Sequence, residues 1–212
     1  HKVIEAARVL KIEDDPAAPY LYTSEETEAR ADELTAGTGP ILALAPAANW
    51  LGKTWPLERF SRVAMRLLND GGMMQGGRLM VLGGPDDAKL AKGLRDVVPR
   101  HQFINLTEGA DLLTAFACLK RARLFLGNDS GTMHLAAAAG VPTVGVFGPS
   151  DEQLYGPWGE STRVARGPRS FEQIHAMDPG FRQALCHMMD LPAETVGDIA
   201  EELLTATEDR YG

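Results

Sequence analysis

The feature that most constrains the fold of this chain is an alternation of short apolar runs with longer amphipathic segments, beginning at Ile41. The apolar runs have the length of strands, and the segments between them carry apolar residues at helical spacing. Strands that alternate with such helices form right-handed βαβ units, in which the strands run parallel. The pattern therefore predicts an α/β fold built on a parallel sheet.

The elements can be placed from the apolar spacing and from Gly, Pro and capping residues. The expected strands are 41–44, 78–82, 103–105, 124–126 and 143–147. The expected helices are 2–11, 25–34 with Ser24 as N-cap, 56–68, one capped by Asp86 or Asp87 and running to about 98, 112–120, 132–139 and 193–207. Residues 1–38 are predicted to be a lead-in or interdomain segment, and 39–212 the domain itself. Ligands of open parallel sheets bind beyond the carboxyl ends of the strands, so the loops there are the candidates for a site.

Charge and composition narrow the function. The formal net charge is -8 and the sequence pI is near 5.1, which argues against nonspecific binding of nucleic acid. A local basic pocket for an anionic ligand is still allowed. Two cysteines without a CxxC pair predict neither a disulfide framework nor a zinc site, and we expect no metal. No apolar run reaches the ~18 residues of a membrane span, so we expect a cytoplasmic protein with at most peripheral membrane contact.

The loop at 127–134 follows an expected strand and opens an expected helix. The first N–H groups of that helix lack internal partners and, with the helix dipole, form an anion site. Gly131 removes a Cβ that would hinder a phosphate, while Ser130 and Thr132 add hydroxyl donors. His134 lies in the first turn and is a further donor. The alternative left open is that Asp129 or Ser130 only caps the helix.

The loop at 45–56 also follows an expected strand and contains Lys53, a candidate to contact a phosphate as a point charge. The alternative for a single lysine is a solvated surface position. The run Gly52-Lys53-Thr54 is similar to the end of a P-loop, but position 47 is Ala instead of Gly and Pro56 marks a later helix start. No dinucleotide-binding GxGxxG follows any expected strand, which weakens a dehydrogenase assignment.

A basic stretch lies towards the C-terminus. Arg163, Arg166 and Arg169 fall in a segment with Gly and Pro and are expected to form a solvated basic loop. Contact with an anionic acceptor or a membrane surface is the alternative.

The two loops, in this order, carry a resemblance to the C-terminal domain of the ADP-heptose:lipopolysaccharide heptosyltransferase family, glycosyltransferase family 9. The similar segments are APAA at 45–48, KTWPLERF at 53–60, VLGGP at 81–85, NDSGTMHLAAA at 128–138, GVPT at 140–143 and FGPS at 147–150. The stretch 128–150 is much more specific than an isolated glycine-rich loop, and the resemblance covers roughly residues 40–205. It implies a Rossmann-like sheet with helices on both faces, the C-terminal half of a GT-B glycosyltransferase.

The resemblance also implies roles for individual residues. Lys53 would contact the diphosphate of an ADP-sugar, with Ser130, Gly131 and Thr132 supplying donors at the helix N-terminus. Asp129 and His134 would orient the sugar-diphosphate.

Two further parts of the site follow from the same resemblance. Asp86 would border the ribose, and residues 105–111 would lie near the adenine.

The implied reaction is inverting transfer of the sugar to a lipopolysaccharide-core-type glycolipid, without a metal. The family's general base is expected in an N-terminal acceptor domain, for which this chain has no room. We therefore expect donor binding without efficient transfer by these 212 residues. Three alternatives stay open: a GT-B enzyme for UDP-sugars, whether transferase or epimerase; a non-catalytic nucleotide-binding module; and a P-loop NTPase.

Overall fold

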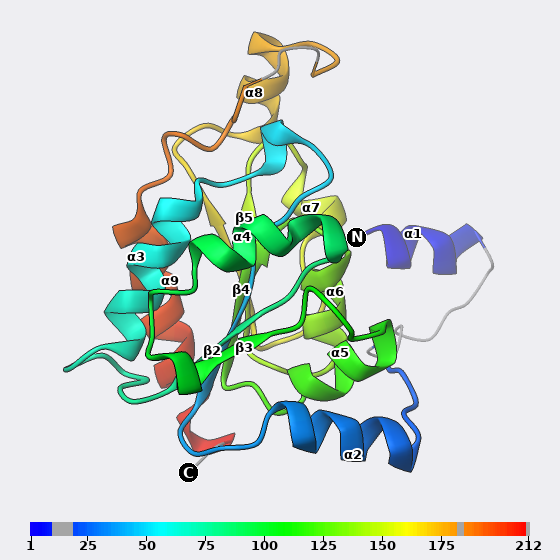
Figure 1. Cartoon of the computed structure of the whole chain (residues 1–212). Coiled ribbons are helices and arrows are strands. Elements are labelled where there is room, and N and C mark those ends of the chain that lie inside the picture. Colours follow the sequence, from blue (N-terminus) through cyan, green and yellow to red (C-terminus); the bar gives the residue numbers. More distant parts are fainter. Residues whose placement is uncertain (10–18, 182–184, 211–212) are drawn as a thin grey trace.

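One parallel sheet organises the molecule. The computed structural model describes residues 1–9, 19–181 and 185–210, and in it six strands pair in the order β3-β2-β1-β4-β5-β6 (Figure 1). The strands are β1 (Ile41–Ala45), β2 (Arg78–Val81), β3 (Phe103–Asn105), β4 (Leu124–Asn128), β5 (Thr143–Phe147) and β6 (Thr162–Arg166). Every pair is parallel. The first strand, β1, lies in the middle of the sheet. The next two strands, β2 and β3, lie on one side of it, and β4, β5 and β6 lie on the other.

The central strands are buried along their whole length. All five residues of β1, β4 and β5 are buried, as expected when helices cover both faces of a parallel sheet. The predicted strands are confirmed, with one extension. β4 continues past residue 126 because Gly127 and Asn128 pair with Gly145 and Val146 of β5.

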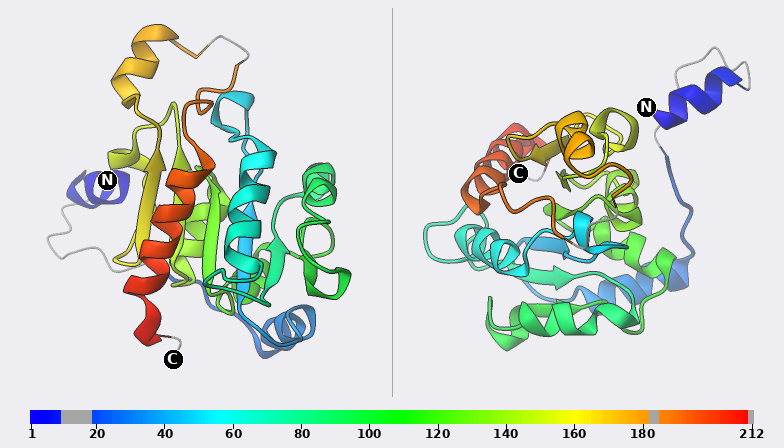
Figure 2. Two further views of the ribbon diagram at one scale, coloured as in Figure 1. Left: turned by 90° about the vertical axis from the view of Figure 1, so that its left-hand side faces the viewer. Right: turned by 90° about the horizontal axis from the view of Figure 1, so that it is seen from above.

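Helices cover both faces, as Figure 2 shows from the side and from above. On one face lie α3 (Leu57–Leu68), α4 (Ala88–Gly93) and α9 (Ala193–Ala206). On the other lie α5 (Leu112–Leu119) and α6 (Gly131–Ala138), with α2 (Glu25–Leu34) packed against α5. The predicted α/β class with helices on both faces is confirmed. α1 (Lys2–Val9) matches the described part of the helix predicted at 2–11.

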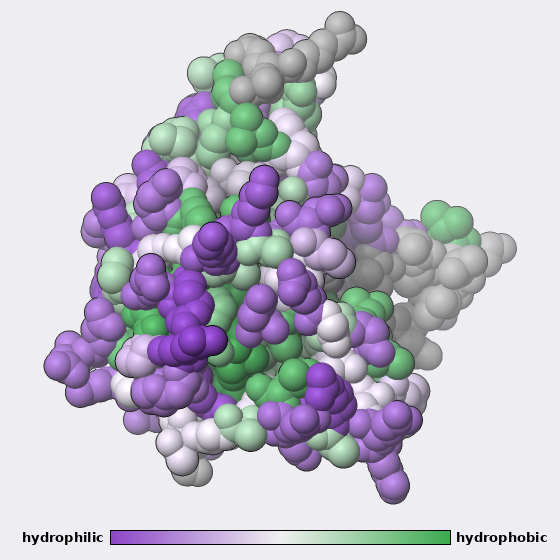
Figure 3. All heavy atoms as spheres, viewed as in Figure 1, coloured by the Kyte–Doolittle hydropathy of each residue, from purple (hydrophilic) through white to green (hydrophobic). Residues whose placement is uncertain are grey.

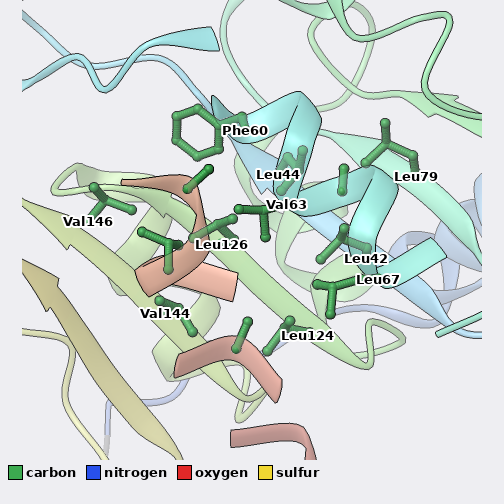
Figure 4. Packing of buried hydrophobic residues seen from close by; sticks show 14 of the residues in the cluster. Leu42, Leu44, Phe60, Val63, Leu67, Leu79, Leu124, Leu126, Val144 and Val146 are labelled. Carbon is green, nitrogen blue, oxygen red and sulfur yellow. The ribbon is translucent and has the colours of Figure 1, made fainter. Parts of the chain in front are cut away.

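The larger core lies between the sheet and the pair α3 and α9 (Figure 4). Its buried members include Leu42, Leu44, Phe60, Val63, Leu67, Leu124, Leu126, Val144, Val146, Val196, Ala200, Leu203 and Leu204. The i, i+3, i+4 spacing in α3 places its five buried apolar residues on this face, as predicted. The second core lies beneath α5 and α6 and includes Met80, Phe116, Phe125, Met133 and Phe147. The sheet therefore lies between two cores, one on each face.

Three helix boundaries differ from expectation. Pro56 occupies the N-cap position of α3 instead of its first turn. α4 ends at Gly93, well before residue 98, because the chain turns at Leu94. Asp87 stands before α4 without capping it: its carboxylate accepts from the Gly84 amide at 2.8 Å, within the 3₁₀ turn Pro85–Asp87.

The segment after β5 is more structured than predicted. It contains α7 (Glu152–Tyr155), β6 and α8 (Phe171–Met177). The expectation of a solvated basic loop for the three arginines is wrong. Arg163 and Arg166 lie on β6, where Arg166 pairs with Glu152 and donates to carbonyls of the loop after β5. Arg169 pairs with Asp190 at 2.5 Å.

The outer surface on the side of α3, α4 and α5 is largely hydrophilic, with apolar areas near α8 and close to the centre (Figure 3). Within the described ranges, no helix is both long and apolar enough to span a membrane.

Candidate functional site

The site lies at the point where the strand order reverses. β1 and β4 are hydrogen-bonded neighbours, yet the helices that follow them, α3 and α6, cover opposite faces. The two chain segments therefore diverge beyond the carboxyl ends of the strands and leave a crevice, where ligands of such sheets bind. The loop after β1 carries Lys53, and the residue after β4 is Asp129.

Lys53 and Asp129 form a close ion pair. Nζ of Lys53 lies 2.5 Å from Oδ2 of Asp129, and the side chains are 18% and 7% exposed. The angles are not those of a hydrogen bond, and Oδ2 has no hydrogen-bond partner within the described structure. Lys53 is thus mostly buried in an ion pair, and it lines the same cavity as Asp129.

The N-terminus of α6 offers unsatisfied donors. Ser130 occupies the N-cap position, but its side chain does not cap the helix. Its Oγ is buried and has no partner among the described protein atoms. The alternative that Ser130 or Asp129 merely caps the helix therefore fails, since Asp129 pairs with Lys53 instead. A buried hydroxyl without a partner at a helix N-terminus marks the place for an acceptor atom.

Gly131 leaves this helix end open. A Cβ built on Gly131 would meet nothing within 4 Å, so it would point into free space beside the helix. The side chain is therefore absent where a ligand has room, and not where the protein itself is crowded.

His134 lies one turn into α6, and its residue is exposed. Desolvation by the protein around the ring lowers the pKa of His134 below its usual 6.5. The carboxylate of Asp129 opposes this shift, and Lys53 adds to it. The imidazole is consequently neutral near pH 7, with one N–H to donate.

The β1 loop is held from outside by the segment that precedes α9. The backbone N–H of His187 donates to the Gly52 carbonyl at 3.2 Å, and Cys186 Sγ donates to the Thr54 carbonyl at 3.1 Å. The indole N–H of Trp55 donates to the Leu191 carbonyl at 3.1 Å. Cys186 and His187 therefore hold the β1 loop through hydrogen bonds. The described residues contain no group of three His, Cys, Asp or Glu that could hold a metal.

Two cavities open on either side of the crevice. One has a volume of about 500 Å³ and is lined by Trp50, Lys53, Asp129, Pro149, Ser150, Asp151, Leu154, Tyr155, Phe171 and Phe181. The other has about 170 Å³ and is lined by Leu82, Gly83, Leu106, Ala110, Asp111, Leu112, Ala115, Thr132 and Leu135. The first is rich in aromatic rings, whereas the second is a small slot at the ends of β2 and β3.

A third cavity, of about 600 Å³ and mostly apolar, lies on the outer side of α6, where His1, Lys2 and Leu21 help to line it. It includes Gly131 and His134 but neither member of the ion pair. We place the site at the ion pair, because the convergent polar groups are there.

The structure brings six of the seven predicted site residues to this region. Lys53, Asp129, Ser130, Gly131, Thr132 and His134 surround the start of α6. Asp86 does not join them: it is exposed in the turn after β2, and the small cavity is lined by Gly83 instead.

The sequence did not predict the aromatic residues that line the cavity of about 500 Å³. Trp50 comes from the loop after β1, and Phe171 and Phe181 come from the segment between β6 and α9. Trp50 and Phe181 have ring centroids 5.7 Å apart. Only their aromatic character was visible beforehand, because the fold of residues 167–192 has no periodic pattern to predict it.

The comparisons with known proteins agree with one another. The model of glycosyltransferase family 9 (heptosyltransferase) matches residues 2–178. Lipooligosaccharide heptosyltransferase 2 of Haemophilus ducreyi is 30% identical over 175 residues, which cover 76% of this chain and 49% of that protein. The chain spans about half the length of the curated relatives it matches.

Solved structures show the same fold. A glycosyl transferase of family 9 from Veillonella parvula matches with a TM-score of 0.76 and 24% identity, covering 96% of this chain and 58% of that one. E. coli ADP-heptose lps heptosyltransferase II matches with a TM-score of 0.73 and 21% identity, covering 93% and 57%. These likenesses confirm the Rossmann-like α/β fold.

Proposed function

The chain belongs to glycosyltransferase family 9, the heptosyltransferases, and on that premise we propose that it binds an ADP-activated heptose-type sugar for inverting transfer to a lipopolysaccharide-core-type acceptor. The observation that carries the proposal is the meeting of Lys53 with the open N-terminus of α6 at the switch point of the sheet. A cation and a row of unsatisfied N–H groups together suit a diphosphate.

The cavities on either side suit the two ends of such a donor. We place the diphosphate between Lys53 and Gly131, and the adenosine in the slot that includes Thr132 and Gly83. The sugar would then enter the cavity of about 500 Å³ beside the ion pair, where aromatic rings can cover its apolar face and Asp129 can accept from a hydroxyl. His134 would donate to the sugar-diphosphate. Asp86 would have to turn inwards to border the ribose.

The chemistry proposed is a single displacement. The acceptor oxygen attacks the anomeric carbon, the bond from that carbon to the diphosphate oxygen breaks, and ADP leaves with the electron pair. Lys53 and the N-terminus of α6 stabilise the negative charge that develops on ADP, so no metal is required. The acceptor proton passes to a base, which we assign to an acceptor-binding half beyond these residues.

Residues 1–38 would form the segment that leads from that half into the donor domain. We also propose that the protein works in the cytoplasm, with at most peripheral contact with the inner membrane and none with nucleic acid.

Calorimetric titration of the 212-residue chain with ADP tests the proposal, with UDP and Mg²⁺ as comparisons. We expect ADP to bind without Mg²⁺ and more tightly than UDP, and Lys53→Ala to weaken binding by about tenfold or more, the range for loss of a charge-assisted contact. Preference for UDP would indicate another sugar-nucleotide enzyme. A need for Mg²⁺ would favour a P-loop, which the start of α3 at Leu57 argues against. No binding would favour a non-catalytic module.

A matched control separates charge from folding. Lys53→Ala leaves the buried carboxylate of Asp129 without its partner, which destabilises the fold by itself. The pair Lys53→Met with Asp129→Asn removes both charges and should recover most of that stability. If ADP binding stays weak in the double variant, the loss comes from the missing cation.

A further inference from the structure

We propose that Asn128 is a positioning residue for Lys53: its side-chain amide closes the loop between β1 and α3 and so delivers Lys53 to the start of α6. The inference rests on the proposed function, because its purpose is to hold the cation where the diphosphate binds. Asn128 itself is completely buried and lines none of the three cavities described above.

The amide of Asn128 joins the two ends of the loop. Its Nδ2 donates to the carbonyl of Pro46 at 2.7 Å, and its Oδ1 accepts from the backbone N–H of Trp55 at 3.1 Å. The orientation of the amide is unambiguous, since a carbonyl needs a donor and an N–H needs an acceptor. One side chain of β4 therefore binds the first residue of the loop that contains Lys53 and a residue near its other end.

Both partners of Asn128 are buried, which makes these two hydrogen bonds necessary. Pro46 is buried and Trp55 is 0% exposed, so water cannot replace the amide at either end. A buried backbone group left without a partner costs more than a typical hydrogen bond contributes. An amide carries its donor and its acceptor on two separate atoms, so it can reach both groups without adding a charge beside Lys53 and Asp129.

The neighbouring residue completes the arrangement. Asn128 holds the backbone of the loop, and Asp129, the next residue along the chain, contacts the ammonium group of Lys53. Successive residues at a strand end point to opposite sides, so each reaches a different part of the same loop. The segment 186–191 braces the loop from outside at Gly52, Thr54 and the Trp55 indole, but these contacts link the loop to that segment and not to the sheet.

Hydrogen exchange in the unmodified chain gives a first test. Among the amides of residues 47–55, the N–H of Trp55 should be protected to nearly the extent of the β4 amides, because its acceptor is a buried side chain. Fast exchange of the Trp55 amide in the folded protein would overturn its hydrogen bond to Asn128 without any substitution.

Asn128→Ala gives the second test, with ADP binding as the readout. We expect ADP to bind about tenfold more weakly, and less than about twofold more weakly when the variant is made in a Lys53→Ala background. Exchange should rise within 46–55 and stay unchanged in β5 and β6. Thr143→Val is the matched control: it removes the bond from the buried Thr143 hydroxyl to the Val141 carbonyl, at the far end of β5, and should leave ADP binding unchanged.

The outcomes separate the two proposals. If the unmodified chain does not bind ADP, the proposed function fails, whatever the exchange pattern shows. If it binds ADP and Asn128→Ala weakens binding equally with and without Lys53, the effect is general destabilisation and the positioning role is wrong. If Asn128→Ala does not fold, the exchange of Trp55 in the unmodified chain still decides.

Discussion

At the scale of single residues, Gly131 gives a clean separation of folding from binding. A methyl group there meets no protein atom, and the backbone is not in the left-handed region. Position 131 is the first residue of a helix, where Ala is at least as favourable as Gly. The residue is thus free to change unless a ligand occupies the space.

We therefore expect Gly131→Ala to keep or raise stability, within about 1 kcal/mol, and to weaken ADP binding by about tenfold. Thermal unfolding and calorimetry on the same sample measure the two effects. Unchanged affinity would place the diphosphate away from the N-terminus of α6.

The lowered pKa of His134 leads to a prediction about protons. Below its usual pKa of 6.5 the unfolded chain binds a proton that the folded chain does not, so this residue makes stability fall as the pH drops through that region. A bound diphosphate adds negative charge beside the ring and raises its pKa again. ADP binding near about pH 6 should then take up protons, a fraction of one per molecule.

Calorimetry in two buffers of different ionisation enthalpy measures this uptake. The terminal phosphate of ADP also titrates in this range, so the contribution of His134 is the difference in proton uptake between the unmodified chain and His134→Gln. His134→Gln should lower the uptake, whereas His101→Gln, on an exposed turn far from the site, should not. Equal uptake in His134→Gln and the unmodified chain would contradict the placement of His134.

The site residues were predictable one at a time, but their contacts were not. The loops after the strands at 41–44 and 124–126 indicated Lys53 and Asp129 as separate candidates. That the two form an ion pair depends on β4 lying beside β1, a neighbourhood set by the strand order. Asp129 was expected to orient a sugar-diphosphate or to cap the helix, and the structure shows it paired with Lys53.

At the scale of elements, α9 is a major part of the larger hydrophobic core. It packs along α3 and contributes Val196, Ala200, Leu203 and Leu204 to the larger core. The segment before it braces the β1 loop, so α9 connects core packing to the site.

Leu203→Ala should therefore lower the free energy of unfolding by about 2–5 kcal/mol, the usual cost of a large-to-small change at a buried position. Glu202→Ala, one residue away on the exposed side, should change it by less than about 0.5 kcal/mol. Denaturant unfolding measures both. Equal effects would mean that α9 is not docked as described.

Apolar periodicity predicted the central elements and failed towards the edge. β1, β4 and β5 are buried throughout and mostly apolar, so their type and approximate position followed from the sequence. β6 is an edge strand whose five residues include two arginines, and only Ala165 is fully buried. A strand of that composition gives no apolar signal. Its arginines instead serve local polar contacts that exist only once the fold has formed.

At the scale of the whole molecule, the two carboxylates that line the cavity of about 500 Å³ already bind other groups of the protein. Asp129 pairs with Lys53, and Asp151 accepts from the Gln153 amide at the start of α7. Each carboxylate therefore has a partner that competes with the removal of a proton from an acceptor hydroxyl.

The 212-residue chain should consequently bind the donor and yet transfer no sugar above background when a lipopolysaccharide-core acceptor is added. General base catalysis typically contributes 10²–10⁴-fold, so its loss is measurable with a labelled donor. Transfer at a normal rate would show that one of these two carboxylates changes partner during the reaction. Asp151→Asn and Asp129→Asn would then identify it.

In the ion pair between Lys53 and Asp129, the carboxylate of Asp129 already occupies the position beside Lys53 that a bound anion would take. A donor that enters does not find a bare cation; it exchanges one anion for another, and the carboxylate that it displaces stays within reach of the sugar. Affinity is then set by how much better a diphosphate serves Lys53 than Asp129 does. A nucleoside without phosphate has no anionic group to replace the carboxylate. ADP, once the sugar has left, keeps the diphosphate and can bind Lys53 nearly as well as the intact donor. The crevice would on this view be inhibited by its own product.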